Sequence, residues 1–106
     1  MTPKQERDCL GYQPFQGDET YVRELTDRFV VTRKDHQCVV CWGAIPTGAR
    51  VRAKREINRE DDVAKTFYFC ESCCAAMVSS WTDNGEEIEK RTAMGIRASR
   101  ALPKEG

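Results

Sequence analysis

The stretch FCESCC, residues 69–74, holds three cysteines within five positions, and the earlier stretch HQCVVC, residues 36–41, holds two more. Each stretch contains a Cys-x-x-Cys pair, in which two thiolates on a tight turn can bind one ion. Two such pairs complete the tetrahedral shell of four thiolates that zinc occupies in closed structural sites. The sequence therefore predicts one structural Zn2+ per chain with these ligands: Cys38, Cys41, Cys70 and Cys73.

The second stretch has one cysteine more than a zinc pair needs. A helix is predicted to begin near Glu71 and to carry an apolar stripe at helical spacing. The stripe consists of Cys74, Met77, Val78 and Trp81. Because a buried free cysteine behaves as a small hydrophobe, we interpret Cys74 as a core residue. The alternative is that Cys74 replaces Cys73 as the fourth ligand.

Length and composition limit the number of domains and the classes of partner that this chain can have. A chain of 106 residues is long enough for one domain, 1–106, with a modest core that a metal can reinforce. Seventeen basic and seventeen acidic residues give no net charge, so no overall field attracts the molecule to nucleic acid or to anionic membranes. The N-terminus is too polar for a secretory signal, and no apolar run approaches the roughly 20 residues that cross a bilayer. We expect a soluble, cytoplasmic protein without membrane partners.

The cysteines also bear on redox chemistry. In a reducing compartment, clustered cysteines more often bind metal or act in redox reactions than form disulfides. A thioredoxin-like function would place one pair in a strand-turn-helix pattern, and neither pair has such surroundings. Thiol redox activity is therefore the less favoured interpretation, and the sequence assigns no role to Cys9.

Local patterns predict helices at both ends of the chain and a hairpin between the cysteine pairs. A capping box at residues 2–5 with proline at the first helical position predicts a helix over 3–10. Residues 11–20 read as a loop, and residues 21–25 fit either a helix or a strand. The remaining elements are predicted as a strand over 28–33, hairpin strands over 50–57 and 64–70, a helix from 71 to before 83, and a helix over 86–101.

The last predicted helix has a thin apolar surface. Asn84 and Glu87 form a possible capping box, and acidic residues fill the first turn. Its apolar residues do not line up on one face, which indicates a helix that lies over the domain or is held by a partner. These residues are Ile88, Met94, Ile96, Ala98 and Leu102.

Together these features resemble a treble-clef zinc finger over roughly residues 30–81: a Cys-x-x-Cys knuckle, a hairpin, and a helix whose first turn carries the second pair. That family frequently has glycine after the second knuckle cysteine, whereas this chain has Trp42 followed by Gly43. The resemblance implies a zinc-stabilised α+β fold, here extended by N- and C-terminal helices. The wider pattern, with Ile-Pro-x-Gly after the knuckle, is similar to small uncharacterised zinc proteins of bacteriophages and prophages, and that similarity implies no activity.

Catalysis is not expected. Treble clefs also build HNH-type nucleases, in which one histidine activates water and a second histidine or asparagine helps to hold a catalytic metal. This chain has a single histidine, His36, and two complete cysteine pairs leave no open coordination position for substrate. A Cys-His nucleophile pair would need thiols that are already assigned to zinc. We interpret His36 as a residue that caps a sulfur or a turn, with metal ligation as the alternative.

Binding is the function class that remains. Residues 21–60 carry nine basic and five acidic residues, and Arg50, Arg52 and Lys54 alternate on one face of a predicted strand. That face either contacts phosphate or is a solvated surface. Protein binding would use the last helix and Trp42, since tryptophan often dominates interface energy. We expect a protein partner, a host factor if the phage similarity holds, and nucleic acid bound through the basic hairpin as the second choice.

Overall fold

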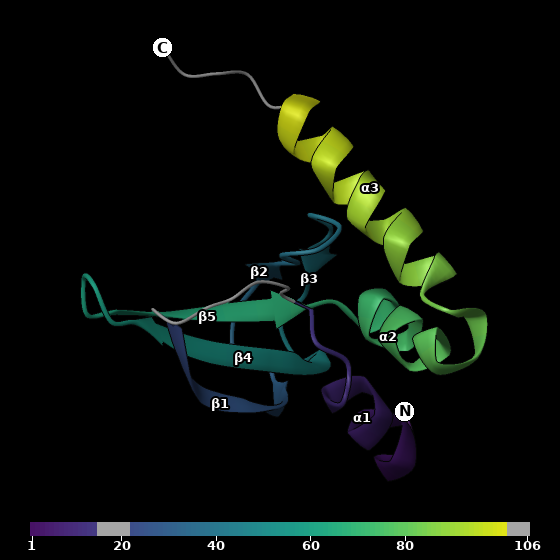
Figure 1. Ribbon diagram of the computed structural model, residues 1–106, viewed down its shortest axis with the longest axis horizontal. Coiled ribbons are helices and arrows are strands. Elements are labelled where there is room, and N and C mark those ends of the chain that lie inside the picture. The colour runs from purple at the N-terminus through teal and green to yellow at the C-terminus, as the bar shows by residue number, and fades with distance from the viewer. Residues whose placement is uncertain (15–21, 102–106) are drawn as a thin grey trace.

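The computed structural model describes residues 1–14 and 22–101 and shows a small α+β protein. Within these residues the chain forms three helices and five strands (Figure 1). In chain order they are α1 (Pro3–Leu10), β1 (Val22–Val31), β2 (His36–Gln37), β3 (Ala44–Ile45), β4 (Arg50–Asn58), β5 (Val63–Phe69), α2 (Glu71–Asp83) and α3 (Glu86–Ala101).

Helix α1 begins and ends where the sequence predicted. The Thr2 hydroxyl accepts a hydrogen bond from the Gln5 N–H, and the Gln5 side chain accepts one from the Thr2 N–H. Pro3 occupies the first turn, where its missing N–H removes no helical bond. This reciprocal cap explains why so short a helix has a defined start.

The strands form two antiparallel sheets. One has the order β1-β4-β5, and the other pairs β2 with β3. Residues 22–25, which the sequence left open between helix and strand, are extended in β1, and a bulge interrupts the register between Glu24 and Thr26. Tyr21 and most of the predicted 11–20 loop lie outside the described residues.

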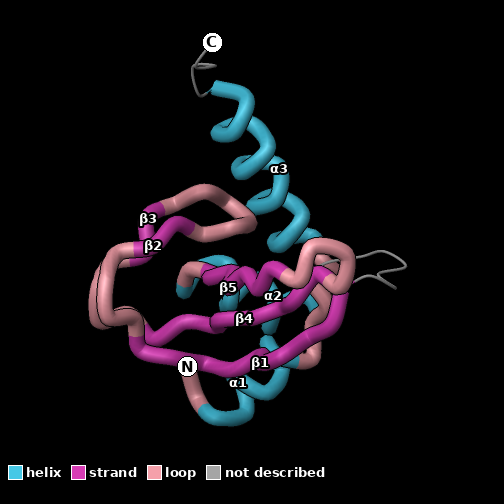
Figure 2. Tube along the Cα trace, turned by 90° about the vertical axis from the view of Figure 1, so that its left-hand side faces the viewer, coloured by secondary structure: helices cyan, strands magenta, loops and turns pink. Residues whose placement is uncertain are grey.

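The elements pack around the end of the larger sheet where β5 ends and β4 begins. There α1 and α2 lie together, and the short β2-β3 pair lies between β5 and α3 (Figures 1 and 2). Fully buried side chains from several elements form the core, and Ile88 of α3 extends it. The largest apolar ones are Phe69, Ile45, Met77, Val51 and Cys9. Cys9 thus has a packing role, with its Sγ 3.7 Å from the Met77 Sδ.

Two expectations for α2 are wrong. Trp81 was placed in the buried stripe, but its side chain is 62% exposed, and its indole N–H donates to the Asp8 carbonyl at 2.9 Å. Trp81 therefore binds the backbone near the end of α1. Asn84 was placed in a cap of α3, but it ends α2 with a φ of 59°. The preceding Asp83 carboxylate accepts the N–H groups at the start of α3 instead.

Candidate metal centre

The first cysteine pair lies in the turn between β2 and β3. The Trp42 N–H donates to the Cys38 carbonyl at 3.0 Å, and the Cys38 N–H donates to the Gly43 carbonyl at 2.9 Å, which closes the turn. Trp42 has a φ of 64°, a left-handed conformation that bulky residues rarely adopt and glycine adopts freely. A tryptophan therefore makes the left-handed turn that follows the second cysteine of this pair, while Gly43 donates its N–H to the Cys41 Sγ at 3.4 Å.

The second pair lies at the start of α2. Cys70 is the N-cap residue, and its Sγ accepts the Cys73 N–H at 3.4 Å. The Cys70 N–H donates in turn to the Cys38 Sγ at 3.3 Å, which joins the helix start to the knuckle. The exposed N–H groups at a helix start favour anionic sulfur, so this position suits thiolates.

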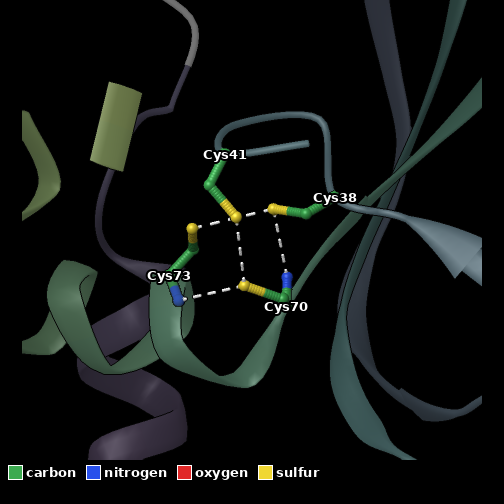
Figure 3. A group of neighbouring side chains, drawn as sticks. All are labelled: Cys38, Cys41, Cys70 and Cys73. Atoms are coloured by element: carbon green, nitrogen blue, oxygen red, sulfur yellow. Dashed lines mark hydrogen bonds between the residues drawn. The ribbon is translucent and has the colours of Figure 1, made fainter. Parts of the chain in front are cut away.

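The four cysteines converge on one point (Figure 3). All four Sγ atoms lie within 4.8 Å of one another, with 3.6 Å between Cys38 and Cys73 and 3.7 Å between Cys41 and Cys70. Sulfurs bound at about 2.3 Å in a tetrahedron around one ion lie about 3.8 Å apart, whereas a disulfide needs about 2.05 Å. The cluster therefore fits a metal ion, and the described cysteines are free thiols.

Arg91 of α3 also contacts the cluster. Its Nε lies 3.0 Å from the Cys73 Sγ and its Nη2 lies 3.6 Å from the Cys41 Sγ. Backbone N–H groups donate to the Sγ atoms of Cys38, Cys41 and Cys70. Together with the bond from Arg91, each of the four sulfurs therefore accepts at least one N–H group. Four thiolates around a divalent ion leave two negative charges, and the guanidinium offsets one of them. Such outer contacts orient ligands and tune the metal.

Hydrogen bonds within the cluster shift the thiol pKa values in opposite directions. Hydrogen bonds with Cys70 and Cys73 lower the pKa of Cys38, and the hydrogen bond with Cys38 raises the pKa of Cys73. The hydrogen bond to Cys73 likewise raises the pKa of Arg91. Arg91 therefore keeps its positive charge beside the sulfurs of Cys73 and Cys41.

The two alternative ligands lie outside the cluster. Cys74 is buried, and its Sγ donates to the Phe69 carbonyl at 3.3 Å, in the core that also holds Cys9. The ring of His36 stacks on Tyr68 with 3.7 Å between ring centroids and 18° between ring planes. His36 therefore contacts an aromatic ring rather than a sulfur.

The predicted basic face is largely internal. Arg52 is 0% exposed, and its guanidinium binds the Asp27 carboxylate through two hydrogen bonds of 2.8 and 2.6 Å. Lys54 is also buried and pairs with Glu24, while Arg50 is exposed and pairs with Glu6. The expectation that these three residues share a solvated or phosphate-binding face is wrong for Arg52 and Lys54, because this face of β4 faces the interior.

Sequence reasoning missed two residues of α3 that contact the knuckle. Gly95 is buried, and a Cβ built on it would lie 1.7 Å from the Val40 carbonyl oxygen. An isolated glycine inside a helical pattern is a signal of such close packing, so Gly95 was open to prediction. Arg91 is one of several charged residues in α3, and nothing in its sequence context distinguishes it from the others.

Comparison of this chain with protein-family models, curated proteins and solved structures finds no match. Among the described helices, none is long and apolar enough to cross a bilayer.

Proposed function

We propose that this chain is a non-catalytic, treble-clef-type zinc module in which one Zn2+ fixes the knuckle to the start of α2. The observation that carries the proposal is the convergence of two Cys-x-x-Cys pairs, one from a β-turn and one from a helix start, at sulfur separations of 3.6 and 3.7 Å. The order of knuckle, β4-β5 hairpin and α2 is the order of elements in a treble clef.

The donor set favours zinc and a structural role. Soft thiolates select Zn2+, Cu+ or iron-sulfur clusters, and zinc accepts a tetrahedral shell of four thiolates without strain. Four protein ligands fill that shell, whereas catalytic zinc sites keep a position for water or substrate. The ion would therefore supply folding energy rather than chemistry.

A partner protein is proposed for the outer side of α3. Ile88 on this helix is 5% exposed, whereas Met94 and Ile96, on either side of the buried Gly95, are 42% and 48% exposed. The same helix thus packs on the knuckle at Gly95 and exposes apolar side chains on the two flanks of that contact. A partner of this kind would be a host factor if the likeness to phage proteins holds.

The zinc proposal is tested by elemental analysis of the purified chain and of two adjacent variants. One zinc per chain is expected for the wild type, with Cys73→Ala losing the metal and unfolding in part because zinc binding contributes to folding. The matched control, Cys74→Ala, should keep one zinc and lose on the order of 1 kcal/mol of packing. Iron with sulfide, no metal, or loss of zinc in Cys74→Ala alone would contradict the proposal.

The partner proposal is tested with the double variant Met94→Asp and Ile96→Asp. Both side chains are exposed, so zinc content and secondary structure should persist while binding of a co-purifying protein is lost. Arg97→Asp with Ser99→Asp places the same two acids elsewhere on the exposed surface of α3 and should leave binding intact. Equal loss in both double variants would argue against a specific apolar contact.

A further inference from the structure

A second surface, which includes none of the four clustered cysteines, lies on the face of the larger sheet opposite to Arg52. There β1, β4, β5 and the loop from β1 to β2 (Figure 2) surround an open groove of about 380 Å³. We call it the outer groove. Its polar and aromatic lining includes Arg28, Arg33, Lys34, Arg55, His36 and Tyr68.

The strand register places these side chains on one face. Arg28 pairs with Ala53, and Ala53 pairs with Tyr68, so these three positions form one row across the sheet. In the next row, Arg55 lies between two threonines, Thr26 and Thr66. Since side chains alternate across a strand, this face excludes Arg52 and Lys54, which point to the interior.

The outer groove is strongly positive although the chain is neutral. Of the described residues that line it, four are cations and none carries a carboxylate. Among the described residues, the ion pairs include none of these four cations. Asp35, which is adjacent to Lys34 in sequence, uses its carboxylate to accept two hydrogen bonds from Thr47. The positive charge of this groove is therefore available to an external anion.

An aromatic pair lies at one side of the outer groove. His36 and Tyr68 are stacked, which fixes both rings. The same two residues also line a neighbouring hollow of about 330 Å³ that Trp42, Val39, Phe67 and the clustered Cys38 border. The cationic groove thus continues past a rigid aromatic pair to the tryptophan of the knuckle.

We propose that the outer groove binds single-stranded nucleic acid. Cations that track a phosphate backbone beside aromatic rings that stack on bases are the two components of such sites. Unpaired bases can reach the rings of His36 and Tyr68, whereas the bases of a duplex are already stacked on one another. An acidic peptide would satisfy the cations and leave the aromatic pair without a matching group. The groove includes none of the four clustered cysteines, so this inference goes beyond the zinc proposal.

The inference is tested by fluorescence anisotropy with the zinc-loaded full chain and a labelled oligo-dT of about 12 nucleotides. With four phosphate contacts that each release about 0.7 counterions, the affinity should fall roughly 50-fold between about 50 and 200 mM salt. Absence of binding at low salt, or binding that salt does not weaken, would overturn the proposal. Tighter binding of a poly-glutamate peptide of equal charge would also overturn it.

Matched variants locate the site. Arg28→Glu with Arg55→Glu should weaken oligonucleotide binding at least tenfold at low salt, because two contacts become repulsive. Arg97→Glu with Arg100→Glu changes the net charge equally on α3 and should retain most of the affinity. Equal losses in both would show that only net charge matters and would refute the assignment to the groove.

Base stacking is tested separately. Tyr68→Leu keeps an apolar side chain and removes one ring, so affinity should fall about tenfold while the dependence on salt stays the same. Zinc content and circular dichroism serve as the measure of folding in each variant. A folded Tyr68→Leu protein with unchanged affinity would show that the bound strand does not use the aromatic pair.

Discussion

The two faces of the β1-β4-β5 sheet carry the same kind of side chain in opposite environments. On the inner face, Arg52 and Lys54 are buried and paired with carboxylates, whereas on the outer face Arg28 and Arg55 are exposed. Arg55 directly follows Lys54 in β4, so one step along a strand separates a structural cation from one that faces solvent. The contrast teaches that the face of the sheet, rather than the residue type, decides what a basic residue does here.

The buried cations of the inner face, Arg52 and Lys54, are each paired with a carboxylate. The Arg52 guanidinium also donates to the carbonyls of Cys9 and Tyr12 at 2.8 and 3.0 Å, which ties the end of α1 to β4. Burial by itself would lower the pKa of Arg52, but the hydrogen bond and charge attraction to Asp27, together with the interactions with Cys9, outweigh burial and raise the pKa overall. Within the described residues no buried side-chain nitrogen or oxygen lacks a partner. Removing one member of this network would leave a buried charge without compensation.

The largest effect is expected from Asp27→Ala on the inner face. The change leaves Arg52 buried without its carboxylate, and loss of one partner of a buried pair costs about 3–5 kcal/mol in the free energy of unfolding. Chemical denaturation of the zinc-loaded protein would measure it. The control is Thr26→Ala, at the adjacent outer position, where less than about 0.5 kcal/mol is expected. Similar losses at both positions would break the contrast between the faces.

The next largest effect is expected from Gly95→Ala, at the position where α3 packs against the knuckle. In an exposed helix, replacing glycine by alanine would raise the free energy of unfolding by about 1 kcal/mol. Here the added Cβ meets the Val40 carbonyl, and overpacking of this kind costs about 1–3 kcal/mol. Thermal unfolding would show whether the variant is stabilised or destabilised relative to the wild type. Ser99→Ala on the exposed side of the helix should be close to neutral, and a stabilised Gly95→Ala protein would show that α3 does not pack on the knuckle.

A smaller effect is expected from Arg91→Ala. Like Arg52 and Lys54, Arg91 is a cation that contacts internal groups, in this case the sulfurs of Cys73 and Cys41. Loss of an outer contact typically weakens metal affinity by 10 to 100-fold, and we expect about tenfold because Arg91 is only partly buried. Competition with a chromophoric zinc chelator would measure the change. Arg91→Lys should recover part of it through charge alone. Arg97→Ala, which removes an exposed cation from the same helix, should leave zinc affinity as it is.

The smallest effect is expected from the outer face itself. Arg28→Ala with Arg55→Ala removes two exposed cations, and surface changes of this type stay within about 0.5 kcal/mol each. The free energy of unfolding should therefore barely change, although oligonucleotide binding should weaken. A clearly destabilised double variant would mean that the outer cations are structural as well, and the two faces would then differ in exposure only.

The sequence by itself determined the local elements and the members of the four-cysteine cluster. Capping residues and helical spacing are encoded within a few positions, which is why α1, α2 and α3 lie where predicted. The Cys-x-x-Cys pairs likewise fix two ligands each within one turn. The packing position of Cys74 followed from its place in the apolar stripe of α2.

Only the tertiary structure decided which face of β4 is internal and which residue supports the sulfurs. Alternation shows that Arg50, Arg52 and Lys54 share a face, but a strand pattern of charges does not state on which side the helices pack. The carboxylates nearest to Arg52 and Lys54 lie in β1, more than 20 residues away in sequence, and Glu56 of β4 is a more distant partner of Lys54 at 4.0 Å. Arg91 reaches Cys73 only because Gly95 lets α3 approach the knuckle. Such contacts depend on packing between distant segments, and short-range sequence patterns carry no information about them.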